Sequence, residues 1–249
     1  MEQMMDISVN GRAMTAFFAR PDSANNSGKG SEKEVPGILL LHEIWGLNEN
    51  IKDIARRLSD EGYAVLAPGL FAGTGMLEKL NFLLQRRTKE VTDEDVQQDI
   101  NDAFAAMQHP AFMPDMMQKL SACFRFLDSH SSGIGKIGIL GFEFGGTCAS
   151  VFAANVPSLQ ACISFYGTLS PKNVMKIRCP VLALYGEKDE GLIGQISEIE
   201  HAVKEKKKKD VIFKVYEDAG HAFFNEKNPE LYNRKAADDA WKLVLKFLK

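Results

Sequence analysis

The sequence predicts an α/β protein built on a doubly wound, mostly parallel sheet with helices on both faces. Short apolar runs alternate with segments of helical periodicity along most of the 249 residues. Such alternation is typical of strand–helix–strand units, whose strands lie side by side in one sheet. We find no internal repeat and no linker between two cores, so we expect a single domain covering residues 1–249.

The chain is expected to begin with a hairpin and a loop. Residues 6–19 alternate apolar and polar around Asn10-Gly11, a dipeptide that favours a tight turn between two strands. Residues 21–35 are polar and rich in Ser, Asn and Gly, and they predict a surface loop.

The remaining elements follow from apolar runs and from helical spacing. The runs short enough for buried strands are 35–41, 63–67, 136–140, 161–166, 179–185 and 211–216. Helical spacing predicts a helix over 51–61, a mainly helical segment over 76–129 with two amphipathic stretches, and a last helix over about 229–248.

Composition excludes several classes of partner. Hydrophobic residues make up 45% of the chain and the net charge is −3, with no broad basic field for nucleic acid. The basic run 206–209 is interpreted as a solvated helix end. The start shows no pattern of a secretory signal, and no apolar run approaches the ~20 residues of a membrane span. The four cysteines have no CxxC spacing, so we expect a cytoplasmic protein with free thiols and no membrane or nucleic-acid partner.

Residues 138–150, GILGFEFGGTCAS, form the most informative motif. An apolar run enters the turn Gly141 to Gly145, and a small-residue segment leaves it. This is the layout of a nucleophile elbow, where a strand turns sharply into a helix and exposes one reactive side chain. The middle position, normally Ser or Cys, is Glu143.

Polar side chains of catalytic type also follow three other predicted strands. Glu43 follows 35–41, Asp189 follows 179–185 and His221 follows 211–216. Parallel strands carry their active sites at their carboxyl ends. The order of elbow residue, acid and histidine is that of an α/β-hydrolase triad, in which His221 would activate a nucleophile or water and Asp189 would orient the imidazole.

Four segments resemble the dienelactone hydrolase family over about residues 6–249. They are LLLHEIWGLNENIKDIARRLSDEGYAVLAPGLF, GFEFGG, LYGEKDEGL and AGHAFFNEKNPELYNRKAADDAWKLVLKFL. The resemblance implies a hydrolase of lactones and esters with no metal or organic cofactor. It implies a triad of Glu143, Asp189 and His221, with Glu43 beside the nucleophile and helping to activate it.

The resemblance also implies an oxyanion hole and a pocket. The oxyanion hole would be the backbone N–H groups of Ile44 and Phe144. We expect Trp45, Phe223 and Asn225 to line the substrate pocket. Founding members carry an arginine after the catalytic histidine that grips a substrate carboxylate. The stretch 222–225 has none, and Arg86 or Arg87 could supply a cation from the helical segment.

Three interpretations of Glu143 stay open. It could be a nucleophile, which suits attack on saturated carbon better than on an ester. It could be a general base for water. It could also mark a disabled site, in which the carboxylate folds back into the oxyanion hole and repels the developing charge. We favour the last, and predict that Glu43 and Glu143 titrate as an interacting pair.

The expected function is hydrolysis of small carboxylic esters or lactones, of carboxymethylenebutenolidase type, impaired in this chain by Glu143. The alternatives are a non-catalytic ligand-binding protein that keeps the pocket, or a carboxylate-nucleophile hydrolase. The expected partner is a small ester or lactone, and the expected assembly is a monomer or homodimer.

Overall fold

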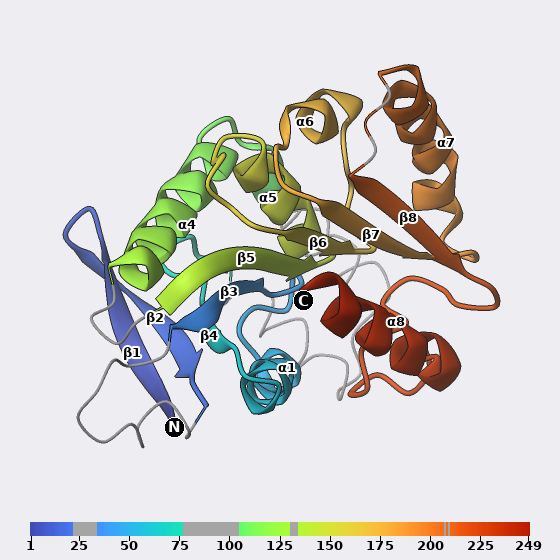
Figure 1. Ribbon diagram of the computed structural model, residues 1–249. Helices are drawn as coiled ribbons and strands as arrows, with labels where there is room; N and C mark the ends of the chain where they lie inside the picture. The colour runs from blue at the N-terminus through green and yellow to red at the C-terminus, as the bar shows by residue number, and fades with distance from the viewer. Residues whose placement is uncertain (22–33, 77–104, 130–133, 207, 209) are drawn as a thin grey trace, which may run out of the picture.

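The computed structural model describes residues 1–21, 34–76, 105–129, 134–206, 208 and 210–249 (Figure 1). The strands in this part of the chain are β1 (Glu2–Val9), β2 (Arg12–Ala19), β3 (Val35–Leu41), β4 (Ala64–Pro68), β5 (Ile134–Phe142), β6 (Cys162–Phe165), β7 (Val181–Gly186) and β8 (Val211–Tyr216). The helices are α1 (Glu49–Asp60), α4 (Phe112–Asp128), α5 (Phe144–Ala153), α6 (Pro171–Lys176), α7 (Glu190–Glu205) and α8 (Arg234–Phe247).

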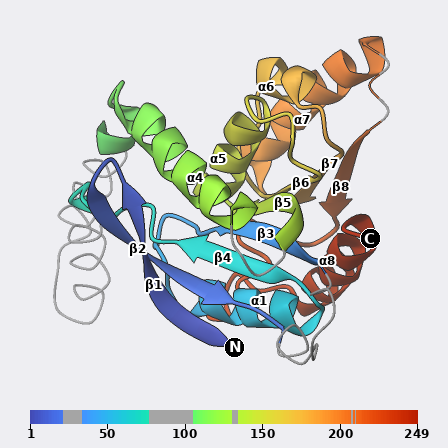
Figure 2. The same ribbon diagram turned by 60° about the vertical axis from the view of Figure 1, so that its left-hand side comes forward.

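The strands form a single sheet in the order β1-β2-β4-β3-β5-β6-β7-β8. The first two pairs in this order, β1–β2 and β2–β4, are antiparallel, and the other five pairs are parallel. The hairpin β1–β2 forms one edge of the sheet and comes forward in Figure 2. Since helices cover both faces, the prediction of a doubly wound, mostly parallel α/β fold is confirmed.

Both faces of the sheet are buried under helices. Figure 1 shows α4, α5, α6 and α7 above the sheet and α1 and α8 below it. Along β3, Leu39 and Leu41 pack into the core under α4 and α5, whereas Ile38 and Leu40 pack into the core with α1 and α8. A strand whose side chains alternate between two cores must be apolar throughout, which explains the continuous apolar runs in the sequence.

Some element boundaries differ from those expected. The hairpin begins at Glu2 rather than near residue 6, although its turn lies at Asn10 as expected. The last helix begins at Arg234 rather than near 229, because the Asn233 side chain caps it by accepting from the Ala236 N–H at 3.1 Å. The helical spacing continues across Asn233 without a break, so the sequence pattern does not reveal this cap.

The segment 76–129 is described only in part. Among its described residues, α4 runs from Phe112 to Asp128 and residues 105–108 are also helical. The rest of the expected helical segment, including Arg86 and Arg87, falls largely outside the described residues.

Of the basic run 206–209, the structure describes Lys206, which is exposed as expected, and Lys208, which is not simply solvated. The Lys208 ammonium is half-buried, donates to the Ile177 carbonyl at 2.8 Å and pairs with Asp210. Among the described helices, none is long and apolar enough to cross a membrane.

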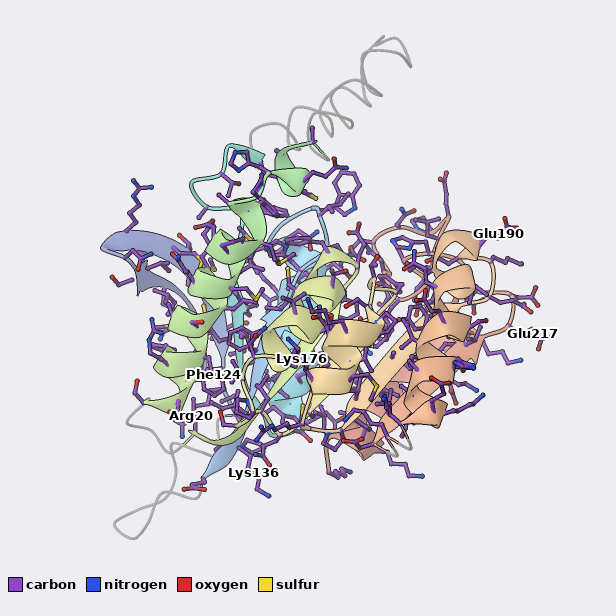
Figure 3. The ribbon with its side chains drawn as sticks, turned by 90° about the horizontal axis from the view of Figure 1, so that it is seen from above. Arg20, Phe124, Lys136, Lys176, Glu190 and Glu217 are labelled. Atoms are coloured by element: carbon purple, nitrogen blue, oxygen red, sulfur yellow. The ribbon has the colours of Figure 1, made fainter. Side chains whose placement is uncertain are left out.

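The sheet register brings the carboxyl ends of the strands together. Leu41 of β3 pairs with Gly141 of β5, and Phe142 pairs with Phe165 of β6. Figure 3 shows Lys136, near the start of β5, and Glu190, just after β7, toward opposite ends of the molecule. The loops that follow β3, β5, β6, β7 and β8 therefore gather where the carboxyl ends of these strands meet, as the site prediction requires.

Candidate active site

The elbow is a tight turn between β5 and α5. Glu143 lies between them with φ 50° and ψ −112°, a left-handed conformation that costs energy for a residue with a Cβ. Its backbone N–H donates to the Phe165 carbonyl at 2.9 Å, and its carbonyl accepts from the Thr147 N–H at 3.0 Å. These two bonds hold the strained residue at the junction of strand and helix.

The turn needs a glycine at its first position. A Cβ added to Gly141 would lie 2.1 Å from the Gly145 carbonyl oxygen. No side chain fits at that distance. The small residues of the motif therefore allow the backbone to close so tightly that Glu143 stands at the tip of the turn.

The Glu143 carboxylate lies against the backbone N–H of Ile44, one of the two groups expected to form an oxyanion hole. Its Oε2 accepts from the Ile44 N–H at 2.8 Å. Burial raises the pKa of Glu143, while hydrogen bonds from the backbone of Ile44 and Phe144 and the nearby His221 oppose that rise. One of the two N–H groups expected to form the oxyanion hole, that of Ile44, thus binds this side chain.

His221 and Asp189 form the acid–histidine pair. His221 Nδ1 lies 2.6 Å from Asp189 Oδ2. The Asp189 side chain is 12% exposed and that of His221 is 43% exposed. His221 also interacts electrostatically with Glu43 and Glu143, since it lowers the pKa of both. The four residues predicted from the strand ends therefore converge.

Glu43 is a buried carboxylate held by two donors. It is 3% exposed. Its Oε1 accepts from the Tyr166 hydroxyl at 3.0 Å, and its Oε2 accepts from the Asn225 side-chain amide at 2.9 Å. Burial and then the charge of Glu143 raise the pKa of Glu43 to about 7, against the effect of both donors and His221. The predicted interaction of the two carboxylates is thus present.

Sequence reasoning missed Tyr166. It follows β6 with φ 37°, is fully buried, and its ring centroid lies 5.2 Å from that of His221. The rule that singled out Glu43 would apply to it, because β6 ends at Phe165 and Tyr166 is the first residue after that strand. The expected strand 161–166 included Tyr166, because its aromatic ring continues the apolar run.

A cavity adjoins Glu43. Its volume is about 520 Å³, and its lining residues are Trp45, Asn48, Glu49, Asn50, Asn225, Lys227, Asn228, Pro229 and Glu230. Two of the expected pocket residues, Trp45 and Asn225, therefore face it. Since Asn225 also donates to Glu43, one wall of the cavity touches the site.

Phe223, the third expected pocket residue, does not line this cavity. It is 0% exposed and packs against Tyr166 and Tyr216, with ring centroids 5.5 and 5.2 Å apart. The adjacent left-handed residue, Ala222 with φ 58°, turns the chain so that Phe223 points into the core while His221 stays half-exposed. The apolar ring of Phe223 is stabilised by its burial in the core, where it is removed from water.

No group of three His, Cys, Asp or Glu side chains in the described ranges could hold a metal ion. His109 and His201 are both exposed. His130 lies outside the described residues.

The parallel sheet, the elbow after β5 and the order of acid and histidine define the class, which is that of the α/β-hydrolases. The sequence pattern of the dienelactone hydrolase family matches residues 16–249, and the chain belongs to this family. Its members are hydrolases.

Individual relatives agree with this assignment. A protein of Saccharolobus solfataricus, provisionally named carboxymethylenebutenolidase, is 30% identical over 269 residues, which cover 100% of this chain and 98% of the relative. The crystal structure of a provisionally named dienelactone hydrolase from Klebsiella pneumoniae has a TM-score of 0.80 at 25% identity and covers 99% and 97% of the two chains. Dienelactone hydrolase from Anabaena variabilis shares the fold, with a TM-score of 0.68 at 16% identity over 99% and 96% of the chains.

Proposed function

We propose that this site is built to hydrolyse small carboxylic esters or lactones, of carboxymethylenebutenolidase type, and that Glu143 impairs it in this chain. The hydrogen bond from the Ile44 N–H to Glu143 Oε2, 2.8 Å long, carries the proposal. The donor that would stabilise a reacting carbonyl already binds a carboxyl group of the protein itself.

The impairment has two physical causes. Attack on an ester builds negative charge on the carbonyl oxygen, which needs the N–H groups of Ile44 and Phe144. A substrate must displace the Glu143 carboxylate to reach them. The same carboxylate, when ionised, also repels the charge that develops in the transition state.

The acid–histidine pair supplies the proton transfers. Asp189 holds the His221 ring through Nδ1 at 2.6 Å, which leaves Nε2 to accept a proton from a nucleophile or water. A cysteine at position 143 would present a thiol to this base at the start of α5, where the helix dipole favours a thiolate. The relatives named carboxymethylenebutenolidase support a lactone as one substrate class.

The test compares the natural chain with Glu143→Cys on short activated esters and small lactones. We expect the variant to hydrolyse them faster by on the order of 10³ or more, because it gains a nucleophile and frees the oxyanion donors. Glu143→Ala separates these effects, since it frees the donors without a nucleophile and should gain little. Glu143→Cys combined with His221→Ala should lose the gain.

Other outcomes would support the alternatives. A natural chain as fast as Glu143→Cys would overturn the impairment and leave Glu143 as a general base or as a nucleophile, the latter tested on alkyl halides and epoxides. Tight binding of esters by both chains without turnover would favour a ligand-binding protein.

We also propose that the protein works in the cytoplasm. All four cysteines, Cys123, Cys148, Cys162 and Cys179, are buried and unpaired, as a reducing compartment permits. Cell fractionation that places the protein outside the cytoplasm would contradict this. The assembly, a monomer or homodimer, stays a prediction that sedimentation can test.

A further inference from the structure

The peptide group between Glu43 and Ile44 is hydrogen-bonded at both ends. Its N–H, which belongs to Ile44, donates to Glu143 Oε2 at 2.8 Å. Its carbonyl, which belongs to Glu43, lies 2.6 Å from His42 Nδ1. In a trans peptide the N–H and C=O point in opposite directions. Whatever holds the carbonyl therefore also sets the direction of the N–H.

The contacts of His42 determine which of its nitrogens carries the proton. The Leu70 backbone N–H can only donate, and it donates to His42 Nε2 at 3.1 Å. Nε2 is therefore unprotonated, and in the neutral ring the proton lies on Nδ1, where it donates to the Glu43 carbonyl. Burial lowers the pKa of His42 to about 4, so the ring stays neutral at ordinary pH.

The ring is anchored on its far side as well. The Leu70 carbonyl accepts from the buried Lys119 ammonium at 2.7 Å, and the Ala72 carbonyl accepts from it at 2.9 Å. The Phe71 ring packs on His42, with centroids 4.9 Å apart. The segment after β4 is thus tied to α4 by Lys119, and His42 is held against that segment.

We propose that His42 is a positioning residue that aims the Ile44 N–H into the oxyanion site. It does so by holding the Glu43 carbonyl on the opposite side of the same peptide. The inference rests on the proposed function, because it assigns a role in stabilising the reacting carbonyl. The two ring nitrogens bond to the Glu43 carbonyl and the Leu70 N–H, so the ring acts through the peptide group.

Two substitutions separate the two contacts of the ring. In His42→Asn the short amide can place its N–H near the position of Nδ1, so it keeps the donor to Glu43 but cannot reach Leu70. In His42→Gln the longer amide can accept from the Leu70 N–H with its oxygen, but the donor at the Nδ1 position is lost. A purely structural role would make the two variants similar or favour His42→Gln.

The kinetic arm uses Glu143→Cys as the parent. We expect His42→Gln to lower kcat for ester hydrolysis by on the order of 10²-fold with little change in KM, as for loss of an oxyanion donor. His42→Asn should stay within a few-fold of the parent. Equal losses in the two variants, or a loss confined to KM, would overturn the proposal.

A second arm uses the natural residue Glu143 and needs no turnover. The Ile44 N–H lowers the pKa of Glu143, so misdirecting this N–H should raise that pKa. In ¹³C NMR titrations we expect His42→Gln to raise it and His42→Asn to leave it nearly unchanged. If Glu143→Cys hydrolyses nothing, the proposed function fails, while this titration still decides the role of His42.

A third measurement needs no variant and so does not depend on how the variants fold. ¹⁵N NMR of the histidine rings reports which nitrogen is protonated. We expect the Nδ1–H tautomer for His42. Protonation on Nε2 would overturn the proposal, because Nδ1 could then not donate to the Glu43 carbonyl.

Discussion

At the scale of single residues, the site is dominated by two carboxylates in one buried volume. Glu43 has hydrogen-bond donors at both oxygens, and Glu143 has them from the backbone, yet the pKa of each is raised. Burial is the largest cause for both, because it withdraws water from the charged form. The hydrogen bonds lower this penalty without removing it.

We expect Glu143→Gln to lower the pKa of Glu43 below its present value of about 7. The substitution removes the negative charge that is the second cause of the rise, while burial keeps the pKa above its ordinary value. A ¹³C NMR titration of Glu43 measures this. The exposed Glu217→Gln is the matched control and should change nothing. An unchanged Glu43 pKa in Glu143→Gln would contradict the interaction.

Tyr166→Phe should change the pKa of Glu43 in the opposite direction. The Tyr166 hydroxyl donates to Glu43 Oε1 and stabilises its ionised form, so its removal should raise that pKa. The same titration checks it. Tyr185→Phe is a matched control, because Tyr185 is equally buried but donates to the Gly167 carbonyl. A similar rise in both variants would point to a general loosening of the core.

At the scale of elements, the elbow joins a strand to a helix through close backbone contacts. Gly141 lies at the end of β5, and a Cβ there would meet the Gly145 carbonyl of α5. Gly194, in contrast, lies exposed inside α7, and a Cβ there would meet nothing within 4 Å. The fold therefore requires a glycine at position 141 but not at position 194.

Gly141→Ala should destabilise the fold by about 3 kcal/mol or more, since the clash involves backbone that cannot yield without opening the turn. Gly194→Ala should be neutral or stabilise by up to ~1 kcal/mol, because alanine favours a helix interior. Urea unfolding of both variants measures these changes. Similar effects of the two substitutions would show that the elbow relaxes easily.

At the scale of the whole molecule, the sheet order joins residues from distant parts of the chain. The donors to Glu43 come from positions 123 and 182 residues away, after β6 and β8. Folding therefore buries a carboxyl group that water would otherwise solvate. The free energy of unfolding should therefore depend on pH through the ionisation of Glu43.

The raised pKa of Glu43 predicts the sign of a pH dependence. The folded chain holds this proton more tightly than the unfolded one, whose pKa is near 4.5. The resulting stability is fully present below 4.5 and is lost as pH rises through about 7. It amounts to at most about 3 kcal/mol.

Glu43→Gln removes this contribution, since its amide can accept from Asn225 and donate to the Tyr166 oxygen without a charge. From pH 5 to pH 8, the free energy of unfolding should fall more for the natural chain than for Glu43→Gln. Urea unfolding of both chains at the two pH values gives the difference. Parallel pH profiles would mean that Glu43 does not titrate differently in the folded chain.

Much of this fold could be predicted because its signals are local. Apolar runs and helical spacing depend on near neighbours, so they indicate strands and helices wherever the chain is later placed. The general rule that parallel sheets work at their carboxyl ends then selected Glu43, Glu143, Asp189 and His221, and all four lie together.

The sequence by itself therefore determined the type of sheet, the elbow at Glu143 and the set of charged residues around it. Only the tertiary structure decided what each side chain touches. It placed the Glu143 carboxylate on the Ile44 N–H, gave Glu43 a tyrosine donor, turned Phe223 into the core and set His42 behind the peptide it holds. Such contacts depend on strand register and on left-handed turns at Glu143, Tyr166 and Ala222, which join segments that no local pattern relates.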